Sequence, residues 1–259
     1  MIEYGNIIIS NFPDGTLHLD CPMNYSSNEI KWFYENDAEL FTLICLKRHL
    51  DEAGCPSPTL YLPYLPNSRM DRVKNESDVF TLKYFCEVIN SLNFSKVVVR
   101  DAHSNVALAL LDRVYQEPID TYIYEVLKDM DENTILFFPD EGAMKRYSNY
   151  FHIPYAFGMK KRNWETGKIE GLEVINKEIV KDKNILIIDD ICSRGGTFLY
   201  SARALKEAGA KDIYLYITHA ENTMVAGEMY NDPNLIKHIY TTNSIFDKKE
   251  DVLNKVSII

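Results

Sequence analysis

The sequence predicts an α/β fold that contains two doubly wound, mainly parallel sheets. Apolar runs of strand length alternate with longer stretches of helical periodicity along all 259 residues. This alternation is typical of parallel sheets with helices on both faces. The length suits two such units rather than one. Because no low-complexity linker is visible, we predict two closely packed domains, residues 1–125 and 126–259.

The predicted elements of the first half begin with a hairpin. The turn Pro13-Asp14-Gly15 separates two short apolar runs, 5–9 and 17–19, which is typical of two strands joined by a tight loop. A helix is expected from about Asp37 to Glu52, because apolar residues recur there at helical spacing. The other elements expected in this half are the strands 59–62 and 96–99 and the helices 79–92 and 105–113.

The second half is predicted to repeat this pattern around one fully apolar strand. Residues 185–188 read Ile-Leu-Ile-Ile, which is typical of a strand buried on both faces. A helix opens at Thr197 and is expected to end before Gly209, which suits the left-handed position after a helix. The other elements expected here are the strands 135–138, 155–159, 212–218, 238–241 and 256–259 and a helix from about Gly142.

Composition limits the functions that the chain can have. The net charge of −10 disfavours non-specific binding to nucleic acid, so any phosphate binding must come from local clusters. The five cysteines form no CxxC pair and are odd in number, which favours a reducing compartment. No signal-like segment opens the chain, and no apolar run approaches the roughly 20 residues of a membrane helix. We therefore expect a cytoplasmic protein with neither nucleic-acid nor membrane partners.

The most informative segment joins a strand, two acids, a glycine-bearing loop and a helix. Asp189 and Asp190 follow the apolar strand, and the loop Ser193-Arg194-Gly195-Gly196-Thr197 leads into the helix. In open α/β sheets, ligands bind outside the carboxyl ends of the strands. Backbone N–H groups at a helix N-terminus form an anion site. Since carboxylates can hold ribose hydroxyls or a cation, this segment predicts a site for a phosphorylated sugar.

Five further segments accompany this one along the chain. They are Phe12-Pro13-Asp14-Gly15, residues 63–72, Asp101-Ala102-His103, Pro139-Asp140-Glu141-Gly142 and Lys160-Lys161-Arg162. In this order and spacing, over about residues 12–220, the chain resembles a short, divergent member of the ribose-phosphate pyrophosphokinase family, the phosphoribosyl pyrophosphate synthetases. The resemblance implies two type I phosphoribosyltransferase-like domains, an ATP side followed by a ribose-phosphate side, with the active site between them. It also implies a homo-oligomer based on dimers.

The resemblance assigns a role to each matching residue. The ATP-binding positions are Phe12, Asp14, Thr16, Arg69, Met70, Arg72 and His103. The positions associated with Mg²⁺ are His103 and Asp140, and the catalytic pair is Lys160 and Arg162, with residues 164–167 as the loop tip. The ribose-phosphate positions are Asp189, Asp190, Ser193, Arg194, Gly195, Gly196 and Thr197. Arginine suits phosphate because its planar donors match phosphate oxygens, and cations can stabilise charge that develops during phosphoryl transfer.

The sequence departs from the family pattern in the phosphate loop. The family has Asp-Thr-Gly-Gly-Thr where this chain has Ser193-Arg194-Gly195-Gly196-Thr197. The change removes a negative charge and adds a long cation, which suits an acceptor whose phosphate carries a further substituent. ADP-ribose, which some divergent relatives accept, is therefore slightly favoured over ribose 5-phosphate. Thr16 and Met70 stand where the family has glutamate and glutamine, and each change puts a contact to the nucleotide in doubt.

The predicted function is a pyrophosphokinase that uses ATP and Mg²⁺. It transfers the β,γ-diphosphoryl group of ATP to an anomeric hydroxyl and releases AMP, in nucleotide or NAD biosynthesis or salvage. One alternative is a phosphoribosyltransferase, which would use phosphoribosyl pyrophosphate and would not need Arg69, Arg72 and His103. Another is a non-catalytic regulatory relative, although such proteins commonly lose the metal-associated and basic catalytic residues that are kept here.

Overall fold

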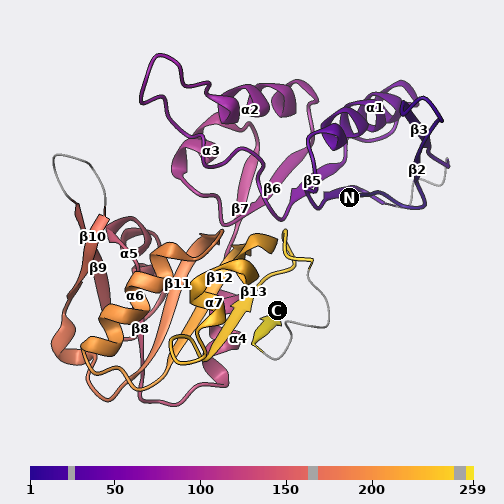
Figure 1. The fold of residues 1–259 in the computed structure, drawn as a ribbon. Coiled ribbons are helices and arrows are strands. Elements are labelled where there is room, and N and C mark those ends of the chain that lie inside the picture. The colour runs from indigo at the N-terminus through magenta and orange to yellow at the C-terminus, as the bar shows by residue number, and fades with distance from the viewer. Residues whose placement is uncertain (23–26, 163–168, 248–254) are drawn as a thin grey trace. The chain divides into compact units, whose positions relative to one another are not determined.

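The computed structural model describes residues 1–22, 27–162, 169–247 and 255–259, without the side chains of 160–162 and 169–170. The chain divides into two compact units, Met1–Pro118 and Ile119–Ile259. Each unit has one main, mostly parallel sheet with helices against it (Figure 1), so the predicted α/β class is confirmed. The division comes earlier than the predicted boundary at residue 125, because Ile119, Ile123 and Val126 pack in the core of the second unit.

Unit 1 contains a five-stranded sheet in the order β1-β4-β5-β6-β7. Strands β4 to β7 pair in parallel, and β1 pairs antiparallel with β4 at one edge. The bounds are β1 (Ile2–Glu3), β4 (Glu29–Trp32), β5 (Thr59–Leu62), β6 (Lys96–Arg100), β7 (Val114–Glu117), α1 (Ala38–Glu52), α2 (Thr81–Ser91) and α3 (Asn105–Leu110). The core gathers apolar side chains from both sheet and helices, including the fully buried Trp32, Leu43, Leu46 and Leu60.

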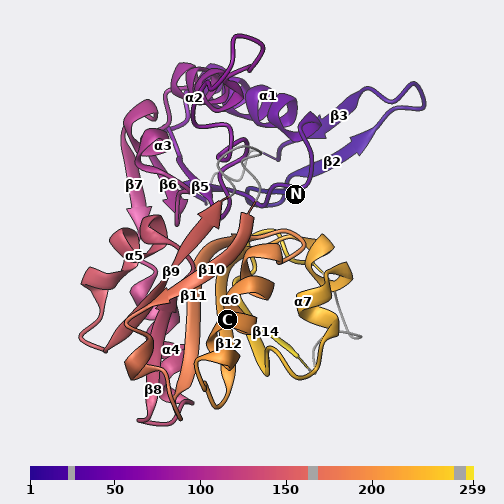
Figure 2. The same cartoon turned by 60° about the vertical axis from the view of Figure 1, so that its left-hand side comes forward.

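The predicted hairpin is a separate two-stranded ribbon of unit 1. Strands β2 (Ile8–Asn11) and β3 (Leu17–Asp20) pair antiparallel. The turn closes through hydrogen bonds from the Phe12 N–H to the Thr16 carbonyl (2.9 Å) and from the Gly15 N–H to the Phe12 carbonyl (2.8 Å). Gly15 has a φ of +84°, a conformation that a side chain would strain. The ribbon extends away from the rest of unit 1 (Figure 2), so its residues contribute little to the core.

Unit 2 contains a seven-stranded sheet in the order β10-β9-β8-β11-β12-β13-β14. Its pairs are parallel except for β9 with β10. The strand bounds are β8 (Thr134–Phe138), β9 (Tyr155–Arg162), β10 (Ile169–Ile175), β11 (Asn184–Cys192), β12 (Ile213–Ala220), β13 (His238–Thr241) and β14 (Val256–Ile258). The helices are α4 (Asp120–Lys128), α5 (Glu141–Tyr147), α6 (Gly196–Glu207), α7 (Glu228–Asn231) and the 3₁₀ turns η1 (Ser148–Tyr150), η2 (Lys177–Ile179) and η3 (Asn222–Ala226).

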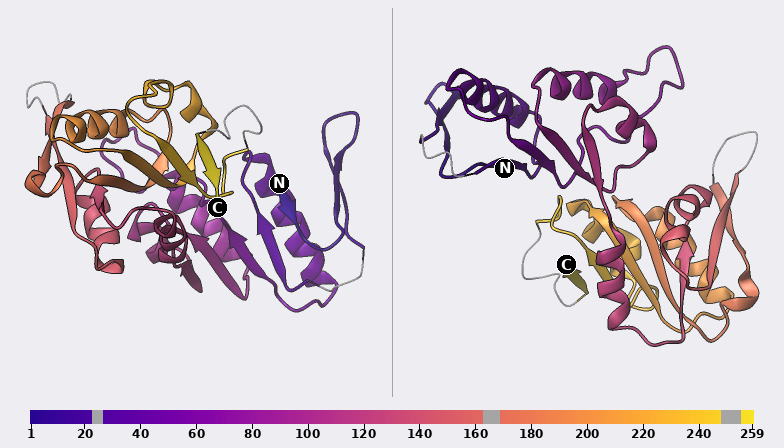
Figure 3. Two further views of the ribbon diagram at one scale, coloured as in Figure 1. Left: turned by 90° about the horizontal axis from the view of Figure 1, so that it is seen from below. Right: turned by 180° about the vertical axis from the view of Figure 1, so that it is seen from behind.

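Strand β11 lies inside this sheet with both faces covered. Ile185 and Ile187 belong to a core cluster that includes α6 side chains, whereas Leu186 and Ile188 pack with residues of α4 and α5. Figure 3 shows the helices on the two faces. The prediction of a fully buried strand is thus confirmed, and the carboxyl end of β11 is held rigidly by its neighbours. Among the described residues, no helix is long and apolar enough to cross a membrane.

Several elements were not predicted from the sequence. Strands β1, β4, β7 and β10 and helix α4 were missed, since they are short or carry charged residues between the apolar ones. The helix predicted at 105–113 ends at Leu110, because Leu111 is already extended and Arg113 has a φ of +53° that turns the chain into β7. Helix α6 ends at Glu207, and Gly209 adopts a φ of +90°, so the predicted glycine stop is confirmed.

Candidate functional site

The two acids lie near the carboxyl end of β11. Asp190 is 3% exposed, and its Oδ2 lies 3.4 Å from Nη1 of Arg146 on α5. Oδ1 of Asp189 accepts a hydrogen bond of 3.0 Å from the Asp190 N–H. Burial, followed by the neighbouring carboxylates of Asp190 and Asp140, raises the pKa of Asp189 well above its usual range. The pair is therefore asymmetric, because Asp190 has a cationic partner and Asp189 is penalised when ionised.

The phosphate loop connects β11 to α6 with the predicted strand–loop–helix geometry. Gly195 precedes the helix with a φ of +76°. A Cβ there would lie 2.6 Å from Cε of Met229, and a Cβ on Gly227 would lie 2.1 Å from the carbonyl oxygen of Arg194. The loop is thus pressed against the start of α7 at two points. The backbone N–H groups of the loop lie at the N-terminus of α6, where they can donate hydrogen bonds to an anion.

Ser193 in this loop takes part in a chain of hydroxyl groups. The Thr223 hydroxyl donates a hydrogen bond of 3.2 Å to Glu221, and the Ser193 hydroxyl lies 3.3 Å from that of Thr223. Either hydroxyl can be the donor in the contact between Ser193 and Thr223. Toward a ligand, the Ser193 hydroxyl can donate or accept a hydrogen bond. Ser193 is a neutral group where the family pattern has an acid.

Asp140 adds a third carboxylate to unit 2. It caps α5, because its Oδ1 accepts a hydrogen bond of 3.0 Å from the Ala143 N–H. Its charge contributes to the raised pKa of Asp189, so the three acids share one neighbourhood. No group of three His, Cys, Asp or Glu side chains in the described part of the chain is arranged as a metal site. Magnesium keeps most of its water and needs few protein ligands, so this oxygen-rich, acidic environment still fits it.

In unit 1, the segment after β5 forms an ion pair. Asp71 is 5% exposed, and its two carboxylate oxygens accept hydrogen bonds from Nε and Nη2 of Arg72 at 2.7 and 3.2 Å. The hydrogen bond from Arg72 is the largest cause that lowers the pKa of Asp71, and the nearby His103 also lowers it. The fork holds Arg72 while its side chain stays exposed. Arg69 and Met70 are exposed beside it.

His103 follows a strained position at the end of β6. Asp101 is 1% exposed and adopts a φ of +42°. Such a conformation is uncommon for residues other than glycine and often marks functional loops. It turns the chain from β6 toward His103, which lies close enough to Asp71 to influence its pKa. Unit 1 therefore brings Arg72, Asp71 and His103 together.

The predicted adenine-contacting residues lie at the tip of the ribbon. The Phe12 side chain is 52% exposed and its ring contacts that of His18, with centroids 4.9 Å apart. Asp14 accepts hydrogen bonds from the Thr16 N–H at 3.0 Å and from its hydroxyl at 2.7 Å, which lower the pKa of Asp14. Thr16 thus orients Asp14 within the turn. The predicted catalytic side chains of Lys160 and Arg162, and the tip 164–167, lie outside the described residues.

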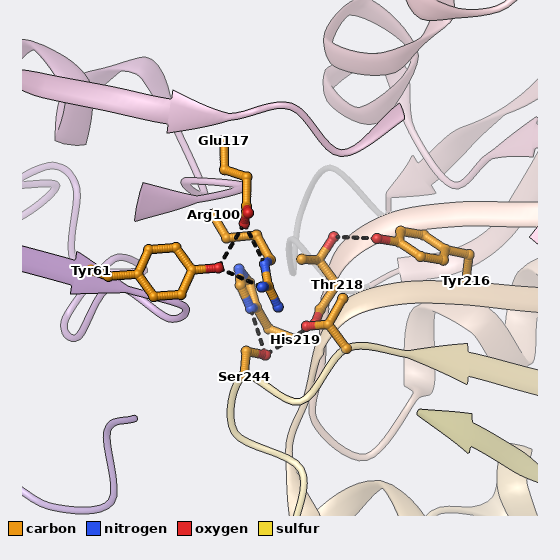
Figure 4. A network of polar contacts seen from close by, with 8 residues as sticks. Tyr61, Arg100, Glu117, Tyr216, Thr218, His219 and Ser244 are labelled. Atoms are coloured by element: carbon orange, nitrogen blue, oxygen red, sulfur yellow. Dashed lines mark hydrogen bonds and ion pairs between the residues drawn. The ribbon is translucent and has the colours of Figure 1, made fainter. Parts of the chain in front are cut away.

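The sequence analysis assigned no functional role to two polar networks, which are drawn in Figure 4. In unit 1, Arg100 donates to Glu117 at 2.7 Å and to the Tyr61 hydroxyl at 2.5 Å, and Tyr61 donates to Glu117 at 2.9 Å. These residues end or almost end β6, β7 and β5. A charged residue closing the apolar strand Lys96–Arg100 was the available signal.

The second network is buried at the end of β12 in unit 2. The Ser244 hydroxyl lies 3.1 Å from the Thr218 carbonyl oxygen and 2.9 Å from Nδ1 of His219. The Thr242 hydroxyl donates to the Thr218 carbonyl at 2.7 Å. The network attaches the chain after β13 to β12.

Comparison with known proteins gives consistent results. A family model described as phosphoribosyl transferase domain matches residues 119–247, which begins where unit 2 begins. The ribose-phosphate pyrophosphokinase of Pyrococcus abyssi is 28% identical over 270 residues, covering 99% of this chain and 90% of its own. That of Saccharolobus solfataricus is 26% identical, covering 93% of this chain and 85% of its own. A crystal structure of phosphoribosylpyrophosphate synthetase from Mycobacterium smegmatis has the same fold, with a TM-score of 0.76 at 18% identity over 98% of this chain and 85% of that one.

Proposed function

The chain belongs to the ribose-phosphate pyrophosphokinase family, and we propose that it transfers the β,γ-diphosphoryl group of ATP to the anomeric hydroxyl of a ribose 5-phosphate unit. It is then an ATP-dependent diphosphotransferase that releases AMP. One observation supports this most strongly: a relative of that name matches nearly the whole chain. The acid pair of β11 and the glycine loop that follows it agree with this proposal.

Unit 1 is proposed to hold the nucleotide. Arg72, kept in place by Asp71, has a planar donor group that suits phosphate oxygens. Arg69 is exposed beside it and would add a second guanidinium. Phe12 offers an exposed aromatic face, and Asp14, oriented by Thr16, offers an acceptor next to it, both for the adenine of a neighbouring chain's ATP. Unit 1 thus carries groups suited to the phosphates of its own ATP and to the adenine of its neighbour's.

Unit 2 is proposed to hold the acceptor. The N–H groups at the start of α6 would bind its 5-phosphoryl group, while Asp189 and Asp190 accept hydrogen bonds from its ribose hydroxyls. The anomeric oxygen then attacks the β-phosphorus of ATP. A new O–P bond forms as the bond to the bridging oxygen breaks, AMP leaves with that oxygen and its electron pair, and the hydroxyl proton passes to solvent. Positioning and charge neutralisation, with Lys160 and Arg162 as cations, supply the catalysis.

Magnesium is proposed to accompany ATP. Within unit 2, Asp140, supported by the neighbouring acid pair, would hold the ion or its water molecules. Within unit 1, His103 would contact the nucleotide phosphates directly or through water. When bound, the ion neutralises negative charge on the transferred phosphoryl groups. Two side chains of unit 2 near this proposed position already have structural contacts. Asp140 keeps its capping bond to α5, and Arg146 balances the charge of Asp190.

The acceptor is proposed to be ADP-ribose, with ribose 5-phosphate as the simpler alternative. Arg194 is exposed in the phosphate loop, where it could bind a second phosphoryl group. Ser193 is neutral where the family pattern has an acid, so it does not repel a further phosphoryl group. Both features favour a ligand that continues beyond the first phosphate. Such a reaction belongs to nucleotide or NAD metabolism.

The direct test compares two acceptors. The full chain is incubated with ATP and Mg²⁺ and with either ribose 5-phosphate or ADP-ribose, and the products are identified by mass. We expect AMP in equimolar amount to a diphosphorylated acceptor, with ADP-ribose preferred. Transfer to ribose 5-phosphate alone would keep the enzyme class and remove ADP-ribose. Activity only with phosphoribosyl pyrophosphate and a base would instead indicate a phosphoribosyltransferase, in line with the domain matched by unit 2.

A further inference from the structure

Arg146 connects the acid pair to the buried core of unit 2. Its Nη1 lies 3.4 Å from Oδ2 of Asp190 and donates a hydrogen bond of 3.2 Å to the hydroxyl of Tyr147. Its guanidinium also lies over the Tyr147 ring, 5.4 Å from the centroid. Tyr147 is 1% exposed and its ring stacks on that of Phe138, with centroids 6.4 Å apart. Arg146 is therefore held on one side by a rigid, buried aromatic pair.

The acid on the other side of Arg146 needs such a partner. The Asp190 side chain is only 5% exposed, and another carboxylate, Asp189, is its neighbour in sequence. A buried charge without a compensating partner is strongly destabilising, and two adjacent carboxylates repel each other. Arg146 contributes a cation to this pair, and its planar donors define a direction for the Asp190 carboxylate.

Helix α5 bears on both members of the pair. Its capping residue Asp140 acts on Asp189, and Arg146, near its last residue, binds Asp190. The capping bond from Ala143 and the packing of Tyr147 fix the helix at both ends. The position of α5 is thus transmitted to the two groups that are proposed to hold the ribose hydroxyls.

We infer that Arg146 is a positioning residue for the acceptor site: it holds the Asp190 carboxylate in the orientation that meets the ribose hydroxyls, and Tyr147 fixes Arg146 for that task. This inference rests on the proposed function. It predicts a specific kinetic signature, because ATP is proposed to be held by unit 1. Loss of Arg146 should weaken the binding of the acceptor and leave the binding of ATP almost unchanged.

The test uses four variants of the full chain. In Arg146→Gln we expect the KM for the acceptor to rise roughly 10- to 100-fold, the range typical of lost supporting contacts, with the KM for ATP changed less than about twofold. Arg146→Lys should recover part of the loss, because the charge remains without the planar fork. Tyr147→Phe should cause a smaller rise in the same constant. Lys145→Gln is the matched control, since it removes an exposed cation of the same helix that pairs only at the surface with Glu141.

A binding measurement separates this inference from the proposed function. Calorimetric titration of each variant with ribose 5-phosphate and with ADP-ribose measures acceptor affinity without turnover. If the wild type binds an acceptor but transfers nothing, the proposed function fails and the titrations still test Arg146. The inference is wrong, and Arg146 is a structural residue, if Arg146→Gln and Tyr147→Phe bind the acceptor like the wild type. The same holds if these variants lose affinity for ATP as much as for the acceptor. Should Arg146→Gln not fold, Arg146→Lys and Tyr147→Phe give the same decision.

Discussion

At the scale of single residues, the acid pair shows how neighbouring groups give two chemically identical side chains different electrostatic environments. Asp189 and Asp190 follow each other in β11, yet only Asp190 has a described ion-pair contact with Arg146. Asp189 instead has burial and two carboxylates around it, and its pKa is raised. A carboxyl group with this environment costs stability when it is ionised and no ligand is bound. In the proposed acceptor site, a sugar hydroxyl or a cation would relieve this unfavourable environment of Asp189.

This leads to a prediction on stability. Because the pKa of Asp189 is raised on folding, its ionisation at neutral pH favours the unfolded chain. Asp189→Asn should therefore raise the unfolding free energy of the ligand-free protein by about 1 kcal/mol at neutral pH while it impairs acceptor binding. The gain should vanish below the unfolded pKa, where Asp189 is protonated in both states. Thermal unfolding across pH measures it, and a variant that is less stable than the wild type at neutral pH would contradict it.

For Asp71, the dependence of stability on pH has the opposite sign. Its pKa is lowered by the hydrogen bond from Arg72, so its contribution to stability is present above the unfolded pKa and is lost as pH falls through the folded pKa. Asp71→Asn should release Arg72 and raise the KM for ATP by roughly tenfold, with little change for the acceptor. Glu87→Gln, which removes an exposed acid of the same unit, is the control. Equal ATP constants in both variants would show that Arg72 needs no support from Asp71.

At the scale of elements, the phosphate loop depends on a second segment that is distant in sequence. Gly195 and Gly227 allow the loop and the start of α7 to touch, one against Met229 and the other against the Arg194 carbonyl. These two contacts restrict the backbone of the loop. The restriction helps the loop to present its N–H groups at the start of α6.

Gly227→Ala tests this packing. The added Cβ would lie 2.1 Å from the Arg194 carbonyl oxygen, so the loop must move. We expect a stability loss of about 1–3 kcal/mol, typical of overpacking, together with at least a roughly tenfold rise in the acceptor KM. Gly171→Ala is the control, because a Cβ there meets nothing within 4 Å. If acceptor binding survives in Gly227→Ala, the loop does not need this contact.

The loop residues are predicted to select the acceptor. The double variant Ser193→Asp with Arg194→Thr restores the family pattern, which lacks the cation and carries an acid. The preference should shift toward ribose 5-phosphate, because the additional phosphoryl group of ADP-ribose loses its cationic partner. The measurement is the ratio of kcat/KM for the two acceptors in the wild type and in the variant. An unchanged ratio would assign the choice of acceptor to other residues.

At the scale of the whole molecule, the ribbon of β2 and β3 bears on assembly. Ile8, Ile9 and Phe12 expose 56%, 40% and 52% of their surface on it. Exposed apolar side chains that are grouped on one projecting ribbon are typical of a surface that contacts another protein chain. The predicted homo-oligomer would bury them and bring Phe12 and Asp14 to a neighbour's adenine.

Assembly can be tested with one substitution pair. Ile9→Ser with Phe12→Ser should shift the protein toward monomers in sedimentation and raise the KM for ATP, since both the contact and the adenine site would lose apolar surface. Tyr200→Ser, which removes a comparably exposed aromatic residue from α6, should leave both unchanged. A wild-type chain that is strictly monomeric and fully active would exclude this arrangement.

The local pattern was enough to predict the α/β class and the strand, acid pair and loop of residues 185–197, although it missed four strands and helix α4. Buried parallel strands are continuous apolar runs, and loops after them need glycines and polar residues, so residues 185–197 carry the signal within themselves. The segments at Arg72, His103 and Asp140 were assigned through the family resemblance. Each is a short stretch that follows a strand.

Only the tertiary structure decided which groups support the site. Arg146 meets Asp190, Glu221 anchors Ser193 through Thr223, and Gly227 fits under the loop. These partners lie on different elements, and no local periodicity relates them. Ion pairs and close packing depend on which elements the sheet order brings together, so Arg146 looked like any surface cation in the sequence. The sequence thus determined which acids and which glycine loop follow β11, and the packing of α5 and α7 determined which groups surround them.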